Sequence, residues 1–187
     1  MIGKLKKMVL KALKNVFGYG EWHISPINER QYAIDIVKWI GDFISMGTIV
    51  EIGCGIGEII GNIKGVGISK YGYDINCNNV VAAQFFHKDT HFICGGFESV
   101  KNKNIEVLIL VNFIHGIEPA ELKTIINKLI NENRVKYFVI DIVSGKGYRY
   151  KHNGSYLLGE KYKRIYKSKN YRAAENGKRW VEIWKEN

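Results

Sequence analysis

Residues 50–57 read Val-Glu-Ile-Gly-Cys-Gly-Ile-Gly and continue an apolar run that begins at Thr48. The run from 48 to 52 predicts a buried strand, and the glycines that follow predict a sharp turn at its carboxyl end. In open sheets of parallel strands, ligands bind beyond the carboxyl ends of the strands. The glycine loop, residues 53–57, is therefore the first candidate binding site.

The spacing of these glycines argues against a dinucleotide site. A dinucleotide-binding loop would place its third glycine at position 58, which is Glu58 here, and Gly57 comes one residue too early. A glutamate at this position is a poor neighbour for a pyrophosphate and a good one for a cationic ligand. We therefore do not expect this chain to bind NAD.

Strands and helices alternate after the glycine loop. Further strands are predicted at 71–74, 91–94, 107–111 and 137–141, with helices at 57–63, 80–87 and 119–130. This alternation predicts right-handed βαβ units and a doubly wound, mainly parallel sheet. Charged, aromatic strands at 161–167 and 179–184, together with a hairpin signal at Asn176-Gly177, predict an antiparallel end. We expect an α/β fold with seven strands.

Two amphipathic helices are predicted before the first strand, over residues 2–17 and 29–44. The length of 187 residues fits one domain, which we divide into an N-terminal helical cap (1–46) and a core (47–187). The lysine-rich first helix packs against the sheet or a partner subunit, or it lies on an anionic membrane as a peripheral contact.

The composition is that of a folded protein, with 46% hydrophobic and 25% charged residues, which excludes disordered and fibrous classes. The net charge is +10, and residues 144–187 carry +8 of it. A basic surface attracts nucleic acid, anionic lipid or phosphorylated metabolites. The alternative is that a lysine-rich sequence simply places its lysines on solvated faces.

The cysteines and the N-terminus both favour the cytoplasm. The three cysteines, Cys54, Cys77 and Cys94, cannot all pair, and none forms a C-x-x-C motif. We therefore expect reduced cysteines and a reducing compartment. Lys11 and Lys14 interrupt the apolar segment that a signal peptide would need, and no apolar run is long enough to span a bilayer.

The pattern E-x-G-x-G-x-G over residues 51–57 resembles motif I of class I S-adenosylmethionine-dependent methyltransferases. Asp74 ends the second predicted strand, where the family's acid binds both ribose hydroxyls of the cofactor. The resemblance covers about residues 45–187, and it implies a Rossmann-like core that binds S-adenosyl-L-methionine. The cofactor-binding residues that it implies are Glu51, Gly53, Cys54, Gly55, Gly57, Asp74, Ile75, Phe97 and Asn112.

The adenine end of the cofactor departs from the family pattern. The family often carries an acid after the third strand, whereas this sequence has Cys-Gly-Gly-Phe-Glu over 94–98. Phe97 could pack on the adenine face, and Glu98 could accept a hydrogen bond from its amine. The fourth strand is followed by Asn-Phe-Ile-His-Gly, which is not the N-P-P-Y tetrapeptide of DNA enzymes that methylate amino groups.

Two histidines are candidate general bases, because imidazole titrates near neutral pH. His115 follows the fourth strand, and its alternative role is to bond a backbone carbonyl at a helix entrance. His152 lies after the fifth strand in the loop 147–154, in which Tyr150 and Arg149 are substrate candidates. Asp141 ends the fifth strand without a second carboxylate nearby, so we expect no metal site.

The segment before the first strand supplies the last two candidates. Trp22 and His23 lie between glycines and Pro26, where they suit a lid or a wall of the acceptor pocket. The alternative is that the tryptophan only packs the first helix onto the sheet.

These observations favour methyl transfer to a small-molecule oxygen or nitrogen, in a glycan or natural-product precursor. The basic C-terminal region keeps open a nucleic-acid methyltransferase that acts on RNA. A non-catalytic cofactor-binding or membrane-associated scaffold is the third alternative. The oligomeric state is left open.

Overall fold

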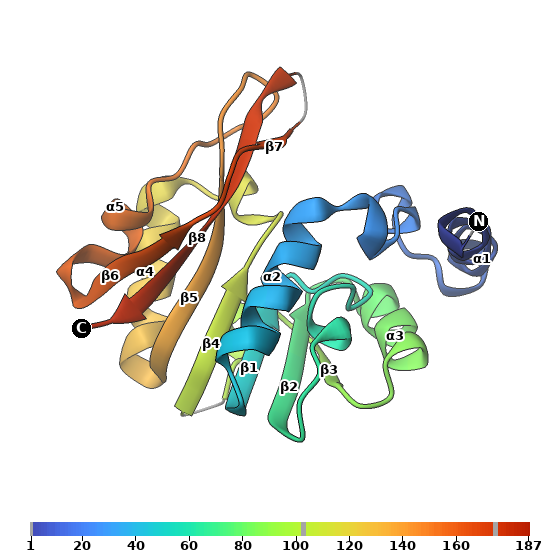
Figure 1. Cartoon of the computed structure of the whole chain (residues 1–187), viewed down its shortest axis with the longest axis horizontal. Coiled ribbons are helices and arrows are strands. Elements are labelled where there is room, and N and C mark those ends of the chain that lie inside the picture. The colour runs from blue at the N-terminus through green and yellow to red at the C-terminus, as the bar shows by residue number, and fades with distance from the viewer. Residues whose placement is uncertain (1, 102–103, 174–175) are drawn as a thin grey trace. The chain divides into compact units, whose positions relative to one another are not determined.

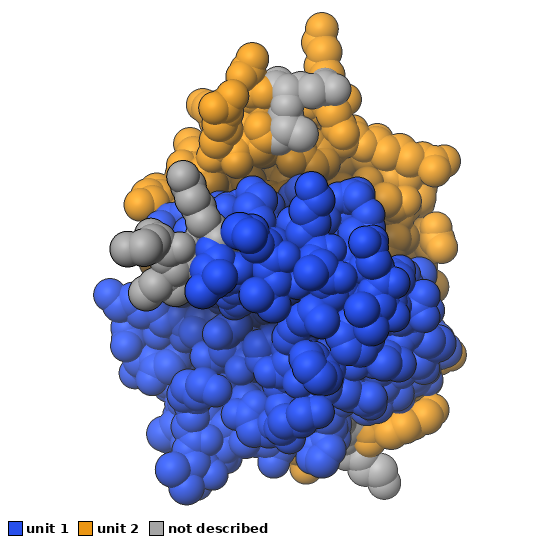
Figure 2. Space-filling view, turned by 90° about the vertical axis from the view of Figure 1, so that its right-hand side faces the viewer, with its two compact units in different colours: residues 1–99 blue, residues 100–187 orange. Residues whose placement is uncertain are grey.

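The computed structural model describes residues 2–101, 104–173 and 176–187. The chain forms two compact units, Met1–Ser99 and Val100–Asn187, which Figure 2 shows in separate colours. The division into a cap and a core at residues 46 and 47 stays a prediction.

The first unit is built on three parallel strands in the order β3-β2-β1. They are β1 (Met46–Ile52), β2 (Gly67–Asp74) and β3 (His91–Cys94). The register pairs Ile52 with Tyr73 and Asp74 with Cys94, so the three strands end at the same edge. The glycine loop leaves β1 at this edge, as the sequence predicts.

Helices flank these strands. They are α1 (Ile2–Phe17), α2 (Gln31–Phe43) and α3 (Cys77–Phe86), with 3-10 turns η1 (Glu21–Ile24) and η2 (Ile27–Glu29) between the first two. Helix α2 buries Tyr32, Ala33, Ile36 and Ile40, the three- and four-residue spacing of one helix face. Figure 1 shows α1 at the margin of its unit, beside α3 and away from β1 and β2.

The helix predicted at 57–63 is wrong. The chain makes turns there and then a single 3-10 turn, η3 (Ile60–Asn62). Gly57 has φ +80°, which a right-handed helix cannot contain. A Cβ on Gly61 would lie 2.2 Å from Cγ of His87, so this segment also packs closely against the end of α3.

The second unit has parallel and antiparallel strand pairs. Its strands are β4 (Asn104–Leu110), β5 (Arg134–Val143), β6 (Tyr162–Lys167), β7 (Tyr171–Arg172) and β8 (Lys178–Glu186). Strands β4 and β5 are parallel, whereas β8 runs antiparallel to β5, β6 and β7. The order is β4-β5-β8-β6, and five of the six residues of β6 are exposed. Helix α4 (Pro119–Glu132) and the short α5 (Gly154–Leu158) complete the unit.

The predicted α/β class and the antiparallel ending are confirmed. The described residues contain eight strands and not seven, because the chain makes the two-residue strand β7 before the predicted turn at Asn176-Gly177. Asn176 has φ +59°, the left-handed conformation that such a turn requires. Within the described residues, no helix combines the length and the apolar character needed to cross a membrane.

Two of the three cysteines form a disulfide, contrary to the expectation of reduced thiols. Cys77 at the start of α3 is bonded to Cys94 at the end of β3, with their Cα atoms 5.0 Å apart. The pairing of β2 with β3 places Cys94 opposite Asp74, three residues before Cys77, so the fold brings the two sulfurs together. Cys54 stays a buried free thiol. The cysteines therefore no longer support a reducing compartment.

We expect thiol reagents to modify one cysteine of the denatured, unreduced protein and three after reduction, as read from intact mass. The disulfide joins residues 17 positions apart, so reduction should lower the free energy of unfolding by about 3 kcal/mol through loop-closure entropy. The double variant Cys77→Ser/Cys94→Ser should show no such response to reductant. Three reactive thiols before reduction would contradict the disulfide.

Candidate functional site

The glycine loop turns through left-handed backbone conformations. Gly53, Gly55 and Gly57 have φ values of +70°, +55° and +80°. Residues with a Cβ rarely adopt this region, whereas glycine does so freely. The amide of Cys54 donates to the carbonyl of Tyr73 over 3.0 Å, which fastens the loop to β2. The loop therefore lies at the carboxyl edge of the strands, where Gly53 is half-buried and Gly55 and Gly57 are buried.

The side chain of His23 lies over this loop. A Cβ on Gly55 would be 2.2 Å from Cε1 of His23, so the imidazole occupies the space that glycine leaves open. Burial lowers the pKa of His23, which favours its neutral form. His23 comes from η1, so the segment before the strands does reach the candidate cofactor loop.

Trp22 points elsewhere. Its side chain is 58% exposed, and the guanidinium of Arg30 lies 5.3 Å from its ring centroid. Arg30 also donates to the carbonyls of Trp22 and Ser25, at 2.9 and 2.6 Å. The side chains of these two neighbouring candidates therefore point to different places. His23 lies on the glycine loop, and Trp22 makes an exposed cation–π contact.

Gly57 also serves internal packing. A Cβ at this position would lie 2.7 Å from Cζ of Phe92, which comes from β3. The absence of a side chain at Gly57 is therefore needed by the core of the unit itself. A close approach by a ligand is not required to explain this glycine.

Asp74 ties the glycine loop to the start of α3. Its Oδ2 accepts the amide of Gly55 at 2.8 Å. Its Oδ1 accepts the amide of Asn76 at 2.9 Å and the side-chain amide of Asn79 at 3.1 Å. A carboxylate has about four acceptor positions, so Oδ2 keeps the capacity to accept from a ligand hydroxyl.

Glu51 is a buried acid beneath the loop. It is 3% exposed, and its Oε2 accepts the amide of Ile60 at 2.9 Å. Burial is the main cause that raises its pKa to about 8, and the negative charge of Asp74 acts in the same direction. Glu51 is therefore mostly protonated at neutral pH.

The side chain of Glu58 contacts the N-terminal segment and does not line the glycine loop. Its carboxylate accepts the amide of Ile27 at 2.5 Å and pairs with the ammonium of Lys6 at 3.3 Å. This buried glutamate explains the departure from a dinucleotide loop in structural terms. It fastens α1 and η2 to the segment that follows the glycines.

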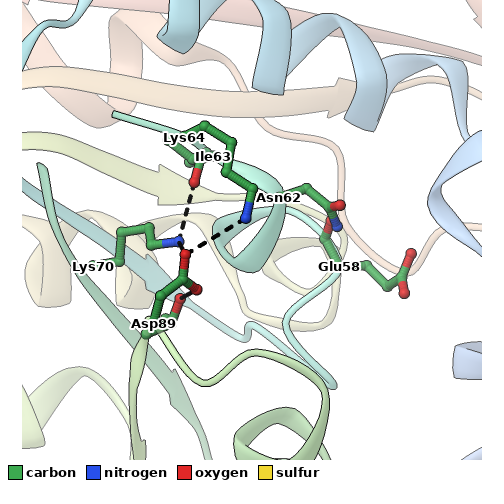
Figure 3. A network of polar contacts seen from close by, with 7 residues as sticks. Glu58, Asn62, Ile63, Lys64, Lys70 and Asp89 are labelled. Carbon is green, nitrogen blue, oxygen red and sulfur yellow. Dashed lines mark hydrogen bonds and ion pairs between the residues drawn. The ribbon is translucent and has the colours of Figure 1, made fainter. Parts of the chain in front are cut away.

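A buried lysine contacts the end of the segment that follows the glycine loop, at Ile63 (Figure 3). Lys70 on β2 is 5% exposed and donates to the carbonyl of Ile63 at 3.0 Å. It also pairs with Asp89 at 2.9 Å, and its hydrogen bond lowers the pKa of that carboxyl. The chain after the glycine loop is thereby fixed at both ends.

The remaining candidates of this unit lie at the strand edge without forming a cluster. Ile75 follows β2 and is 83% exposed, whereas Cys54 is buried within the loop. Phe97 is half-buried in the 3-10 turn η4 (Phe97–Ser99). Glu98 accepts the amide of Gly96 at 2.9 Å, so its carboxylate already serves the turn.

The second unit contains a buried polar cluster centred on Asp141. This carboxylate is fully buried and accepts the amide of Asn112 at 3.0 Å. It also contacts Nε2 of His115 at 3.2 Å and Nε of Arg179 at 3.3 Å. Asn112 has φ +77°, and its side-chain oxygen accepts from Arg179. Positive φ outside glycine is uncommon and marks a position that the surrounding contacts enforce.

The hydrogen bonds of His115 and His152 fix which ring nitrogen carries the proton in the neutral forms. Nε2 of His115 faces Asp141, and Nε2 of His152 faces the carbonyl of Ile114 at 2.8 Å. Both partners only accept, so Nε2 is the donor in each ring. Among the described residues, Nδ1 of either ring has no hydrogen-bond partner. Each histidine therefore holds a buried lone pair.

The loop around Tyr150 closes over these histidines. The amide of Tyr150 donates to the carbonyl of His115 at 3.2 Å, and the ring of Tyr148 meets His115 edge-on at 5.2 Å. The two imidazole centroids are 6.2 Å apart, and burial lowers the pKa of His152. The structure thus brings together the four candidates of this unit, Asn112, His115, Tyr150 and His152.

Two buried charged residues of β8 are not among the candidates that the sequence predicts. Arg179 is 6% exposed beside Asp141, and Glu182 is 4% exposed. Glu182 accepts from the indoles of Trp180 and Trp184, at 3.0 and 3.1 Å. Asp141 could have indicated such a partner, because a carboxylate that follows an apolar run in a buried strand needs a cation nearby. Within the described ranges, no group of three or more acidic, histidine or cysteine side chains could hold a metal ion.

No protein-family model and no curated protein matches the sequence. Solved structures do resemble its fold. Magnesium protoporphyrin IX methyltransferase from Synechocystis PCC 6803, with bound SAH, superposes with a TM-score of 0.72 at 14% identity, over 86% of this chain and 84% of that one. N-methyltransferase NodS from Bradyrhizobium japonicum WM9, also with SAH, gives 0.72 at 10% identity, over 95% and 97%.

TehB from Haemophilus influenzae gives a TM-score of 0.66 at 13% identity, over 82% of this chain and 62% of that one. These likenesses show that the chain has the fold of class I S-adenosylmethionine-dependent methyltransferases, as the glycine motif predicts. At such identities they establish the fold alone.

Glu51 should make stability fall as the pH rises. Its folded-state pKa of about 8 lies above its ordinary value of 4.5, so its contribution is complete below pH 4.5 and is lost as the pH rises through about 8. Glu51→Gln should remove a slope of up to about 1.4 kcal/mol per pH unit in this window, as measured by urea unfolding. The exposed Glu121→Gln should keep the wild-type profile. Equal profiles for Glu51→Gln and wild type would contradict the buried, protonated acid.

Proposed function

We propose that this chain is an S-adenosylmethionine-dependent methyltransferase that acts on a small-molecule oxygen or nitrogen acceptor. The observation that carries the proposal is the left-handed loop of Gly53, Gly55 and Gly57, held by Asp74 at the carboxyl edge of β1 and β2. In the fold that this chain shares, ligands bind at that edge. One neighbour is named for magnesium protoporphyrin IX and another for N-methylation, which supports a small acceptor.

The residues of the loop fit this cofactor. Asp74 keeps an acceptor position on Oδ2 for a ribose hydroxyl, and the half-buried Gly53 has no side chain that would keep the rest of the cofactor from the loop. Asp74 is the acidic group beside the loop, which suits a cationic ligand. When bound, the cofactor supplies a methyl group on a positively charged sulfur. The imidazole of His23 fills the space beside Gly55, so a ligand that approaches Gly55 would contact or displace this side chain.

Replacing the loop acid should weaken cofactor binding. Asp74→Ala removes the acceptor for ribose, so we expect the dissociation constant for S-adenosylmethionine to rise about 5- to 150-fold in titration calorimetry, which corresponds to about 1–3 kcal/mol. Asp42→Ala, at an exposed acid of α2, is the matched control and should bind as wild type does. An unchanged affinity in Asp74→Ala, or binding of NAD in place of the methyl donor, would refute this assignment.

His115 is the base that we assign to a hydroxyl acceptor. Asp141 holds the Nε2–H of its ring, so the lone pair on Nδ1 is available to take a proton. Arg179 pairs with the buried carboxylate of Asp141 at 3.3 Å and balances its charge. His152 offers a second lone pair, with a pKa lowered by burial. An amine that is already nucleophilic would need only alignment.

The reaction class and the base are tested together with cofactor labelled at its methyl group. We expect label in the small-molecule fraction of a cell extract and none in its RNA, whereas label in RNA would favour the nucleic-acid alternative. On the labelled acceptor, His115→Ala should lower kcat about 10²- to 10⁴-fold without changing cofactor affinity.

Asp141→Asn should shift the pH profile of kcat, because an amide no longer fixes the proton on Nε2. The exposed His91→Ala is the control and should leave kcat unchanged. If His115→Ala and His152→Ala both keep wild-type turnover, neither histidine is the base.

A further inference from the structure

Helix α1 carries two apolar faces, and only one of them is used within the protein. Leu10 is buried in a cluster with Tyr19, Ile56 and Ala82. Phe17 follows on the same side and packs against Phe85 and Phe86 of α3, at 5.2 and 6.3 Å between ring centroids. This face attaches the helix to its own unit.

The other apolar face is exposed. Its large side chains are Leu5, Met8, Val9 and Val16, which are 65%, 69%, 46% and 73% exposed. Their spacing of three, four and seven residues places them on one side of the helix. We call these four residues the outer stripe. On α3, Val81 and Phe85 are also 52% and 51% exposed, and Phe85 touches Phe17 of α1.

The charge of the helix indicates what covers the outer stripe. Residues 2–17 contain five lysines and no acidic residue. Lys11 is exposed and lies next to Met8, three residues along the helix, and Lys6 lies beyond Val9 with a side chain that is 40% exposed. Lysines beside an exposed apolar stripe are complementary to the headgroups and acyl chains of an anionic bilayer.

Ion pairs hold this arrangement in place. Lys6 pairs with Glu58 at 3.3 Å, Lys7 pairs with Glu29 at 2.9 Å, and Lys14 pairs with Glu21. The three acids lie in the unit that α1 packs against, so the paired lysines are drawn towards the protein. Leu5, Met8 and Val16 face away from it, whereas Val9 also lines a pocket with Leu10 and Glu58. Figure 1 shows the helix at the margin of its unit.

A second copy of the chain fits the stripe less well. Two copies that met through α1 would bring two lysine-rich helices together in a protein of net charge +10. We propose that α1 is a peripheral membrane anchor, which places the outer stripe at the acyl boundary of an anionic membrane and the exposed Lys11 among the headgroups. This proposal goes beyond methyl transfer and does not depend on it.

Vesicle sedimentation with the full chain tests the proposal. We expect binding to vesicles of phosphatidylcholine with 30% phosphatidylglycerol, weaker binding to phosphatidylcholine alone, and weaker binding at 0.5 M salt, where charges are screened. The triple variant Leu5→Gln/Met8→Gln/Val16→Gln should lower the partition coefficient at least tenfold. These side chains are exposed, so circular dichroism and the melting temperature should stay those of wild type.

Val66→Gln is the matched control, because Val66 is a fully exposed apolar residue outside α1. It should bind vesicles as wild type does. Equal binding by the triple variant and wild type would overturn the proposal. Failure of the wild-type protein to bind anionic vesicles would overturn it as well. If that protein instead forms a dimer in analytical ultracentrifugation and the triple variant does not, the outer stripe is covered by a second copy and not by a membrane. Lys11→Gln should reduce binding at low salt and have little effect at 0.5 M salt.

Discussion

The first unit depends on the left-handed turn of the glycine loop. Because Gly55 and Gly57 have no Cβ, His23 and Phe92 can approach the backbone from two different elements. The same turn points the amide of Gly55 at Asp74, which in turn holds the start of α3. A substitution in the loop would therefore disturb the N-terminal segment, β3 and α3 together. The loop is therefore a packing centre of its unit as well as the proposed cofactor site.

The second unit has a comparable centre in Asp141. A buried carboxylate is costly unless it is paired and hydrogen-bonded, and this one receives a backbone amide, an imidazole and a guanidinium. Satisfying Asp141 fixes the strained backbone of Asn112 and the orientation of the His115 ring. The polar groups that the proposed chemistry needs are thus positioned by the requirement to neutralise one buried charge.

The sequence predicted β1, β4 and β5 well, because each contains an apolar run that is followed by a glycine or a polar residue. Strand β5, for example, extends the predicted run at 137–141 by a few residues at each end. The helix at 57–63 could not be excluded from its apolar residues, since the backbone angle of Gly57 depends on Phe92 and His87, which are distant in sequence. The Cys77–Cys94 disulfide depends on the pairing of β2 with β3, and cysteine counting does not contain that information.

The candidate site residues likewise include some that local sequence predicts and some that depend on strand pairing. Asp74 follows from the local pattern at a strand end. The role of Arg179 requires the antiparallel register of β8 on β5, which places this side chain within reach of Asp141. A candidate such as Asp74, which lies at the end of a strand, can be predicted from the sequence of that one segment. Residues that neutralise a buried charge from another strand need the folded structure.

Strand β6 has a consequence for how copies of this protein behave at high concentration. It is the last strand in its order, so one row of its backbone amides and carbonyls has no neighbouring strand among the described residues. Such an edge is a template for pairing with another chain. Here the exposed strand carries Lys163, Arg164 and Lys167, and a second copy aligned along it would bring like charges together. The basic C-terminal region therefore protects an open edge of the sheet against aggregation, whatever else it binds.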